Sequence, residues 1–459
     1  MRLLKNWLDT ISAWRTVFPQ QRTTDRAIRQ GLGALVCLGR RTLTRIIWAN
    51  GGEQRNWSSE YFLHSRVHWE PQGLFAPILK QALPLCPGRL VGVAVDDTKL
   101  HKTGRCIQQA FYQRDPLSPP FHANLILGLR FLQASLLIPL HQRTAASCRA
   151  LPIRFEQSPR VKRPGKNATQ EEYKQYRQRR KQTNLSTHFV AMMGQTRKAL
   201  DDAGGVQKTL IVSTDGSFCN RTVFTAPRDR TEIVARARKD ARLCKRAPDG
   251  SGRFYDANKF TPEQVRKDDT IPWHTTKIFY GGKRRIVRYK ELDPLHWQGG
   301  ARKQPLRLIV VAPTPYRKRK SSKLYYRNPA YLLTTDRLDS AKALLQIYFD
   351  RWQIEVNHRE EKDTLGVGQA QLWNPISVPK QPVLVVAAYS ALLLAALLAF
   401  GPKRTSDYAK LPKWRRNAKR PSCLDLITLL RKEMDEHPET LVPLGINNSL
   451  KGLATSTAA

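Results

Sequence analysis

The sequence is short of acidic residues. It has 37 Asp and Glu against 78 Lys and Arg, which gives a formal net charge of +41 over 459 residues. Such a surplus of one sign is far outside the range of an ordinary soluble enzyme and is rarely needed for solubility alone. It therefore indicates a polyanionic partner, most often nucleic acid. The alternative is a charge shell that only keeps the chain soluble.

The sequence also lacks cysteine pairs and an apolar N-terminal segment. Its seven cysteines are widely spaced and form no Cys-x-x-Cys pair, which argues against a zinc finger and against a disulfide framework. Reduced thiols in a cytosolic protein fit this pattern best. Residues 1–7 lack the apolar core of a signal peptide.

Apolar residues are plentiful, at 41% of the chain, so wholesale disorder is excluded. The segment Val383–Phe400 is apolar except for Tyr389 and Ser390 and reaches the length of a membrane span. Ala-rich runs of this length also occur as central core helices. We interpret the segment as a buried helix and expect no membrane partner, with a membrane span as the alternative.

Residues 1–88 have the apolar spacing of helices. Asp25–Leu38 and Thr42–Ala49, with Gly39 between them, resemble a helix-turn-helix whose second, basic helix would enter a major groove of DNA. A plain helical hairpin fits the same pattern. We predict a helical N-terminal DNA-binding region over 1–88.

The period changes after residue 88. The expected strands, in chain order, are Leu90–Val95, His122–Phe131, Ala134–Leu140, Thr209–Thr214, Thr231–Arg238 and Tyr331–Thr335. The expected helices are Ser186–Ala203 and a long one over Ser340–Leu365, and an irregular stretch with strand-like pieces lies at about 245–325. The basic segment Arg160–Lys181 is a solvated arm or helix for which DNA contact is the preferred role.

This order of elements predicts an α/β fold of the ribonuclease H-like type, a mixed sheet with helices on both faces. We assign residues 89–400 to this domain, with a β-rich insertion at about 245–325. Residues 401–459 form a basic C-terminal helical region and tail.

Two acidic residues follow apolar strands in this basic chain. Asp96 and Asp215 each terminate a predicted strand, so both carboxylates emerge at one edge of the sheet if the strands are neighbours. Two hard oxygen ligands there would make a site for Mg²⁺. Taken singly, each residue also fits a turn former, as in Asp215-Gly216.

A third carboxylate lies on the predicted long helix. Tyr348, Arg351, Glu355 and Lys362 fall within an arc of roughly 60° at helical spacing, and Arg359 joins the same face. The cations suit phosphates, and the carboxylate suits a metal. A solvated face with ion pairs such as Glu355–Arg359 is the alternative.

The spacing Tyr-x2-Arg-x3-Glu-x6-Lys resembles the signature of the Tyr-Arg-Glu-Lys group of bacterial insertion-sequence DDE transposases. The resemblance extends to the Asp-x-Thr at Asp96 and Thr98 and to the Asp-Gly at Asp215. It implies that Asp96, Asp215 and Glu355 are the catalytic, metal-binding triad. Asp97 leaves the first ligand ambiguous by one residue, and Asp96 is favoured because the group usually places Asp two before Thr.

The resemblance also implies that Tyr348, Arg351, Arg359 and Lys362 contact DNA. The expected cofactor is two Mg²⁺ ions, for which Mn²⁺ can substitute, clamping an in-line displacement at a phosphodiester. The expected reaction cuts the ends of an insertion sequence and joins their 3′-OH groups to target DNA.

The expected partners are double-stranded DNA, both transposon ends and target, and at least one further copy of the chain during synapsis. The expected location is the bacterial cytoplasm at the nucleoid. Two alternatives are a ribonuclease H-like nuclease without strand transfer and a catalytically inactive DNA-binding relic.

Overall fold

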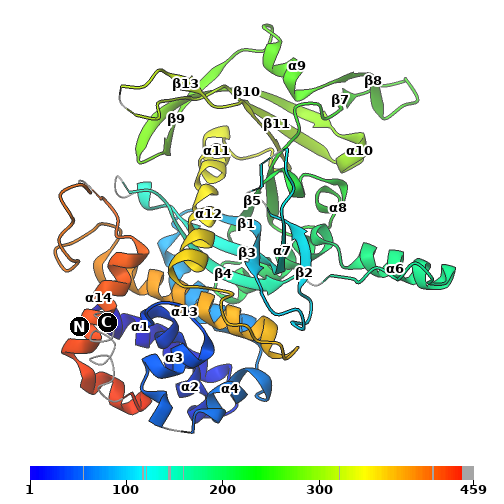
Figure 1. Cartoon of the computed structure of the whole chain (residues 1–459). Coiled ribbons are helices and arrows are strands. Elements are labelled where there is room, and N and C mark those ends of the chain that lie inside the picture. Colours follow the sequence, from blue (N-terminus) through cyan, green and yellow to red (C-terminus); the bar gives the residue numbers. More distant parts are fainter. Residues whose placement is uncertain are drawn as a thin grey trace. The chain divides into compact units, whose positions relative to one another are not determined.

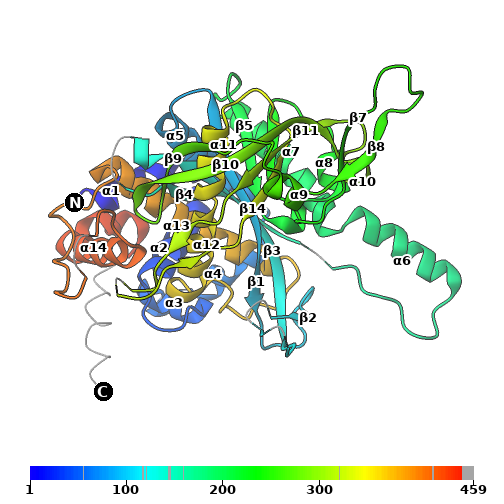
Figure 2. The same ribbon diagram turned by 90° about the horizontal axis from the view of Figure 1, so that it is seen from above.

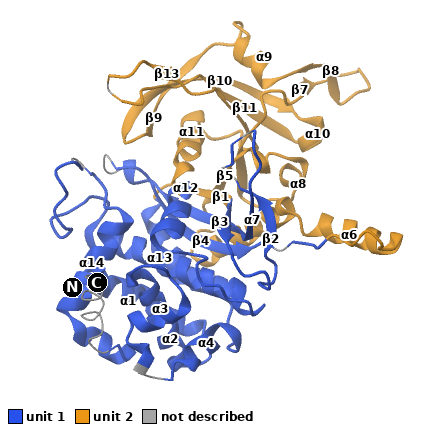
Figure 3. Cartoon of the chain, in the orientation of Figure 1, with its two compact units in different colours: residues 1–86, 97–162, 354–459 blue, residues 87–96, 163–353 orange. Residues whose placement is uncertain are grey.

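The computed structural model describes residues 1–54, 56–115, 118–119, 121–142, 146–158, 160–319, 321–415 and 418–446. They form two compact units (Figure 3). Unit 1 comprises Met1–Cys86, Asp97–Lys162 and Ile354–Ala459, and unit 2 comprises Pro87–Asp96 and Arg163–Gln353. Strand β1 (Leu90–His101) and helix α12 (Trp352–Arg359) run from one unit into the other. The predicted tail over 447–459 lies outside the described residues.

The N-terminal part of unit 1 is helical, as its apolar spacing predicts. Gly39, with φ +71°, lies between α2 and α3, and the Thr42 side chain caps α3 by accepting from the Arg45 backbone N–H at 3.3 Å. DNA binding by this pair stays a prediction. The helices are α1 (Leu3–Ser12), α2 (Gln21–Val36), α3 (Leu43–Ala49), α4 (Ser58–Ser65) and α5 (Ala76–Ala82), joined by 3-10 turns at Ala13–Thr16, Gly52–Gln54, Pro71–Phe75 and Leu83–Leu85.

Unit 1 also holds the long apolar helix α13 (Ser377–Phe400). It is long and apolar enough to cross a membrane, but 89% of its most apolar window is buried. The interpretation of this segment as a buried helix is therefore confirmed. Helix α14 (Cys423–Glu436) follows it, and the 3-10 segment Pro438–Leu444 comes last.

Two strands that the sequence predicted separately are one strand in unit 1. The residues expected to form two strands, His122–Phe131 and Ala134–Leu140, form the single strand β3 (Leu125–Ile138). Leu132 and Gln133 are fully buried and continue the strand, because neither is a turn former. β3 pairs with β2 (Phe111–Arg114), with β4 (Arg149–Gln157) and with β1.

Unit 2 is built on a mixed sheet (Figure 1). The strands β1, β5 (Thr209–Thr214) and β6 (Thr231–Arg236) are parallel neighbours, and β14 (Ala330–Thr334) joins β6 in the antiparallel sense. Next in order come β11 (Pro305–Val311), β10 (Lys283–His296), β7 (Leu243–Arg246) and β8 (Tyr255–Phe260), with β9 (His274–Tyr280) beside β10 and β12 (Pro315–Tyr316) paired with β13 (Tyr325–Tyr326). This mixed α/β architecture confirms the predicted fold class.

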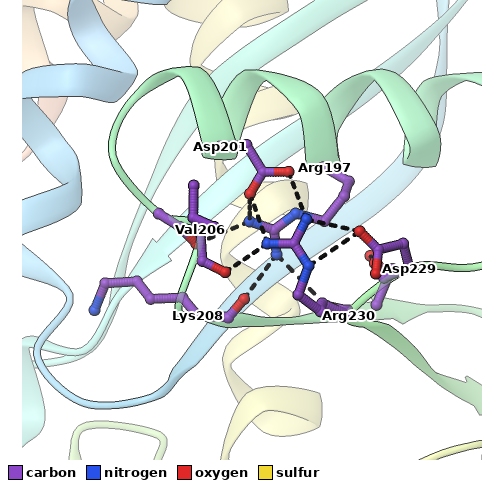
Figure 4. Close-up of polar contacts among 8 residues, drawn as sticks. Arg197, Asp201, Val206, Lys208, Asp229 and Arg230 are labelled. Carbon is purple, nitrogen blue, oxygen red and sulfur yellow. Dashed lines mark hydrogen bonds and ion pairs between the residues drawn. The ribbon is translucent and has the colours of Figure 1, made fainter.

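The helices of unit 2 are α6 (Gln170–Gln182), α7 (Leu185–Asp202), α8 (Arg221–Phe224), α9 (Pro262–Lys267), α10 (Gln298–Ala301) and α11 (Ala341–Asp350). A cluster of arginines and aspartates fixes the end of α7 to the start of β5 and β6 (Figure 4). Arg197 pairs with Asp201 at 2.6 Å and donates to the Lys208 carbonyl at 2.7 Å. Arg230, just before β6, pairs with Asp201 at 2.9 Å and Asp229 at 2.6 Å.

The prediction of one continuous helix over Ser340–Leu365 is wrong. The segment consists of α11, α12 and a π-helical turn at Glu360–Thr364, in which the Leu365 N–H donates to the Glu360 carbonyl. A π turn holds one more residue than an α turn. Periodicity at 100° per residue does not detect this insertion.

Candidate active site

Asp96 lies on β1 and Asp215 directly follows β5, and these two strands are neighbours in unit 2. β1 and β5 run parallel in the register Ala94↔Ser213, and the two aspartates are each two residues further along. Residues two apart point to the same face of a sheet, and neighbouring strands lie about 4.8 Å apart. The sequence left it open whether these two strands are neighbours, and the pairing of β1 with β5 meets that condition.

The strand ends differ in detail from the prediction. Asp215 follows β5 directly, where its carboxylate accepts from the Ser217 backbone N–H at 2.9 Å and from the Ser217 hydroxyl at 3.2 Å. Asp96 does not terminate its strand, because β1 continues to His101 as the partner of β3. Asp96 is therefore held by strand backbone on both sides.

A residue that the sequence reasoning missed completes this row. β5 and β6 run parallel in the register Ser213↔Val234 and Thr214↔Ala235, so Arg236 is the next position opposite Asp215. Arg236 is exposed at the end of β6. The sequence did contain a signal for Arg236, since it is a cation at the end of a predicted apolar strand.

Tyr348 and Arg351 come from α11 and the residue after it. Ala341, Leu344 and Leu345 of α11 pack in the core of unit 2, together with Ile211 of β5 and Val234 of β6. This packing brings the end of α11 to the carboxyl ends of the strands. There the Arg351 Nη1 lies 3.5 Å from the Asp96 Oδ2, and both side chains are largely buried.

The electrostatics of Tyr348 place it among the same charges. Burial raises the pKa of its phenol, Arg236 and Arg351 lower that pKa, and Asp215 raises it. The net direction is upward, so the phenol keeps its proton at neutral pH and can donate a hydrogen bond. Unit 2 therefore brings together four predicted residues, Asp96, Asp215, Tyr348 and Arg351.

The other three predicted residues follow in unit 1. Glu355 lies one helical turn after Arg351 on α12, half-buried, and Arg359 ends α12 with an exposed side chain. Lys362 lies in the π turn. The uniform spacing that puts Lys362 on one face with Tyr348 and Glu355 does not hold there, because the π turn changes the rotation per residue.

Asp97 has a different partner from Asp96. Its Oδ2 accepts from the Arg130 Nε of β3 at 2.7 Å, within unit 1. Successive residues of a strand point to opposite faces, so Asp97 faces away from Asp96. Asp97 thus contacts Arg130 and faces away from the side of the sheet that Asp96 shares with Asp215, which favours Asp96 as the proposed ligand.

The donor set suits a hard divalent cation. Within the described part of the chain, no group of three or more His, Cys, Asp or Glu side chains is placed to hold a metal ion. Asp96 and Asp215 nevertheless offer two carboxylates on neighbouring strands. Mg²⁺ in phosphoryl-transfer sites is commonly held by one or two carboxylates, with the remaining ligands from water and substrate phosphate. The two aspartates fit that requirement.

Comparison with known proteins identifies the family of the chain. A family profile described as DDE superfamily endonuclease matches residues 17–303, which is more than half of the chain. The matched part includes Asp96, Asp215 and Arg236 and ends before α11. A search of curated proteins gives no significant match. Endonucleases of this superfamily act on DNA and generally use divalent metals such as Mg²⁺. The chain belongs to the DDE superfamily endonucleases.

Proposed function

We propose that this endonuclease is an insertion-sequence transposase of the Tyr-Arg-Glu-Lys group, which cuts the ends of its element and joins them to target DNA. The observation that carries the proposal is the row of Asp96 and Asp215 on adjacent parallel strands, with Arg351 lying 3.5 Å from Asp96. Arg351 belongs to the Tyr-x2-Arg-x3-Glu-x6-Lys spacing, whose carboxylate, Glu355, is one helical turn further on.

Asp96, Asp215 and Glu355 are the proposed metal ligands. Two Mg²⁺ ions, when bound there, supply an activated attacking oxygen and charge stabilisation for the leaving oxygen at a phosphodiester. Mn²⁺ has similar ligand preferences and is expected to substitute. The carboxylates bind metal and form no covalent bond with DNA.

The neighbouring cations and phenol hold the DNA backbone. The charges of Arg351 and Arg236 both lower the pKa of the Tyr348 phenol, and guanidinium groups can bind the oxygens of a phosphate. Arg359 and Lys362 extend the basic character along the chain. Holding the scissile phosphate in line with its attacker is the main contribution of these side chains.

The proposed reaction consists of two in-line displacements at phosphorus, each at a phosphodiester held in the same site. In the first, water attacks phosphorus, the bond to the 3′ oxygen breaks, and that oxygen takes a proton to become the 3′-OH of the element end. In the second, this 3′-OH attacks a target phosphodiester and loses its proton, while the target's 3′ oxygen leaves and is protonated. Only the nucleophile changes between the steps.

The rest of the chain is assigned to DNA binding and assembly. The helices of residues 1–88 are the proposed sequence-reading region, 89–400 the catalytic domain with its insertion at about 245–325, and 401–459 an accessory basic region. Pairing two element ends requires at least a dimer. A cytoplasmic, nucleoid-associated location follows from this activity.

A strand-transfer assay tests the proposal. Purified protein is mixed with 3′-OH oligonucleotides that copy the inverted repeats flanking its gene, with supercoiled plasmid and Mg²⁺, beside the variant Glu355→Gln. Joined products that disappear in the variant support the transposase. Nicks without joining would instead establish a nuclease, and DNA binding with neither product would indicate a DNA-binding relic.

A further inference from the structure

Helix α6 of unit 2 has no buried residue along its 13 positions. It extends away from the other elements of its unit (Figures 2 and 3). A helix this short is marginal in water unless packing or its ends stabilise it. Tyr173 and Tyr176 are half-buried and the other residues of the helix are exposed, so burial of an apolar face does not explain α6.

The ends of α6 supply that stabilisation. Thr169 and Glu172 form a capping box, in which the Thr169 hydroxyl accepts from the Glu172 N–H and the Glu172 carboxylate accepts from the Thr169 N–H. Acidic residues occupy the first turn and Arg179, Arg180 and Lys181 the last, as the helix dipole favours. Beyond the end, Asn184 donates to the Lys181 carbonyl at 2.8 Å. The sequence thus specifies a helix that stands in solvent.

The charges on α6 are sorted by face. At 100° per residue, Lys174, Arg177, Arg180 and Lys181 fall within an arc of about 120°. We call these four residues the basic face; all four are exposed. A second arc of about 60° holds Glu171, Gln175, Gln178 and Gln182.

The sorting argues against a shell that serves only solubility. Four of the five cations of α6 lie on the basic face, where Gln170 in the first turn is the one glutamine, and Arg179 lies outside it. The ion pair between Lys174 and Glu171, at 3.8 Å with both side chains largely exposed, leaves the face available because exposed pairs are weak. A row of exposed cations on a preformed helix is complementary to the phosphates of a polyanion.

We propose that the basic face of α6 binds the phosphate backbone of duplex DNA without regard to sequence. The inference rests on the proposed function, which supplies DNA as the substrate, and adds the surface that grips it. Lys and Arg side chains on phosphates position a duplex and read no bases. The contact therefore serves any DNA that the enzyme must hold, target DNA included.

The test compares two triple variants with equal charge change. Lys174→Gln/Arg177→Gln/Lys181→Gln removes three cations from the basic face, and Gln175→Glu/Gln178→Glu/Gln182→Glu adds three anions to the other arc. Gln and Glu keep helix propensity close to that of Lys and Arg, and circular dichroism checks the fold of both proteins. Affinity for a random-sequence duplex is measured from 50 mM to 400 mM salt.

The basic-face variant is expected to bind at least about tenfold more weakly at 50 mM salt, with a slope of log affinity against log salt shallower by about 2.7, or 0.9 for each lost phosphate contact. The control is expected to keep a slope near that of the wild type. Equal effects of the two variants, or an unchanged slope in the basic-face variant, would overturn the inference. The inference would also be overturned if the basic-face variant lost binding to phosphatidylglycerol vesicles but kept its binding to DNA, since the partner would then be a lipid surface.

The outcomes separate this inference from the proposed function. A changed slope together with absent cleavage and joining would support the basic face and overturn the transposase. Cleavage and joining by the wild type, together with an unchanged slope in the basic-face variant, would support the transposase and overturn the role of the basic face.

Discussion

We predict that Glu361, in the π turn after α12, makes the free energy of unfolding fall as pH rises. Its side chain is only 1% exposed. Burial raises the pKa of Glu361 to about 8 from a usual 4.5, and the nearby Glu360 adds to the rise, while a hydrogen bond with Gln133 and the charge of Lys362 oppose it. At neutral pH the folded protein therefore holds a proton on Glu361 that the unfolded chain releases.

The sign and size follow from proton linkage. Below pH 4.5 both states bind the proton, so Glu361 has no effect on the free energy of unfolding. As pH rises from 4.5 to 8 the unfolded chain loses the proton first, so stability falls. A difference of about 3.5 pKa units corresponds to about 5 kcal/mol at full deprotonation.

The perturbation is Glu361→Gln, which keeps the shape and removes the titration. Urea unfolding of wild type and variant is compared from pH 5 to pH 9. The variant is expected to gain stability over the wild type progressively, by up to about 5 kcal/mol at pH 8 and above. Glu171→Gln, at an exposed position of α6, is the matched control and is expected to give a nearly constant difference. If the Glu361→Gln difference stays constant with pH, the reasoning about this buried carboxyl is refuted.

The remaining predictions concern the candidate active site. Glu355→Gln is expected to lower DNA cleavage at least about a thousandfold, a loss of about 4 kcal/mol at the transition state, with DNA affinity in a filter-binding assay near wild type. Asp96→Asn is expected to lower cleavage by as much as Glu355→Gln does. Asp97→Asn breaks the ion pair with Arg130, so it should change cleavage less than about tenfold and lower the free energy of unfolding by about 1 kcal/mol. The reverse ranking of these two variants would move the first ligand to Asp97. Arg236→Gln is expected to raise KM for DNA more than it lowers kcat, and unchanged kinetics would remove Arg236 from the phosphate-binding set.

Local patterns in the sequence predicted much of unit 2. Thr209–Thr214 has both bounds right, because an apolar run between turn residues leaves few alternatives for a strand. The same pattern, followed by Asp, identified Asp96 and Asp215 as candidate site residues. These features depend on residues that are adjacent in the chain.

Pairings over long distances could not be predicted in this way. Arg236 became a candidate only through the register of β6 against β5, and the ion pair of Asp97 with Arg130 depends on the pairing of β1 with β3. The π turn that displaces Lys362 arises where Glu360 and Glu361 are buried, which helical periodicity does not report. Each of these facts is set by tertiary packing.

The central claim is that Asp215 holds a divalent metal while DNA is cut. Its most direct test is the cleavage rate of Asp215→Cys in Mg²⁺ and in Mn²⁺, beside Asp215→Ala. Mg²⁺ and Mn²⁺ both prefer oxygen ligands, but Mn²⁺, as a transition metal, accepts a thiolate ligand more readily than Mg²⁺ does. The account predicts that the Cys variant loses cleavage in Mg²⁺ and regains at least about tenfold in Mn²⁺, a change of about 1.4 kcal/mol, while the Ala variant stays inactive in both. Equal losses of the Cys and Ala variants in both metals, or full activity of either in Mg²⁺, would contradict it.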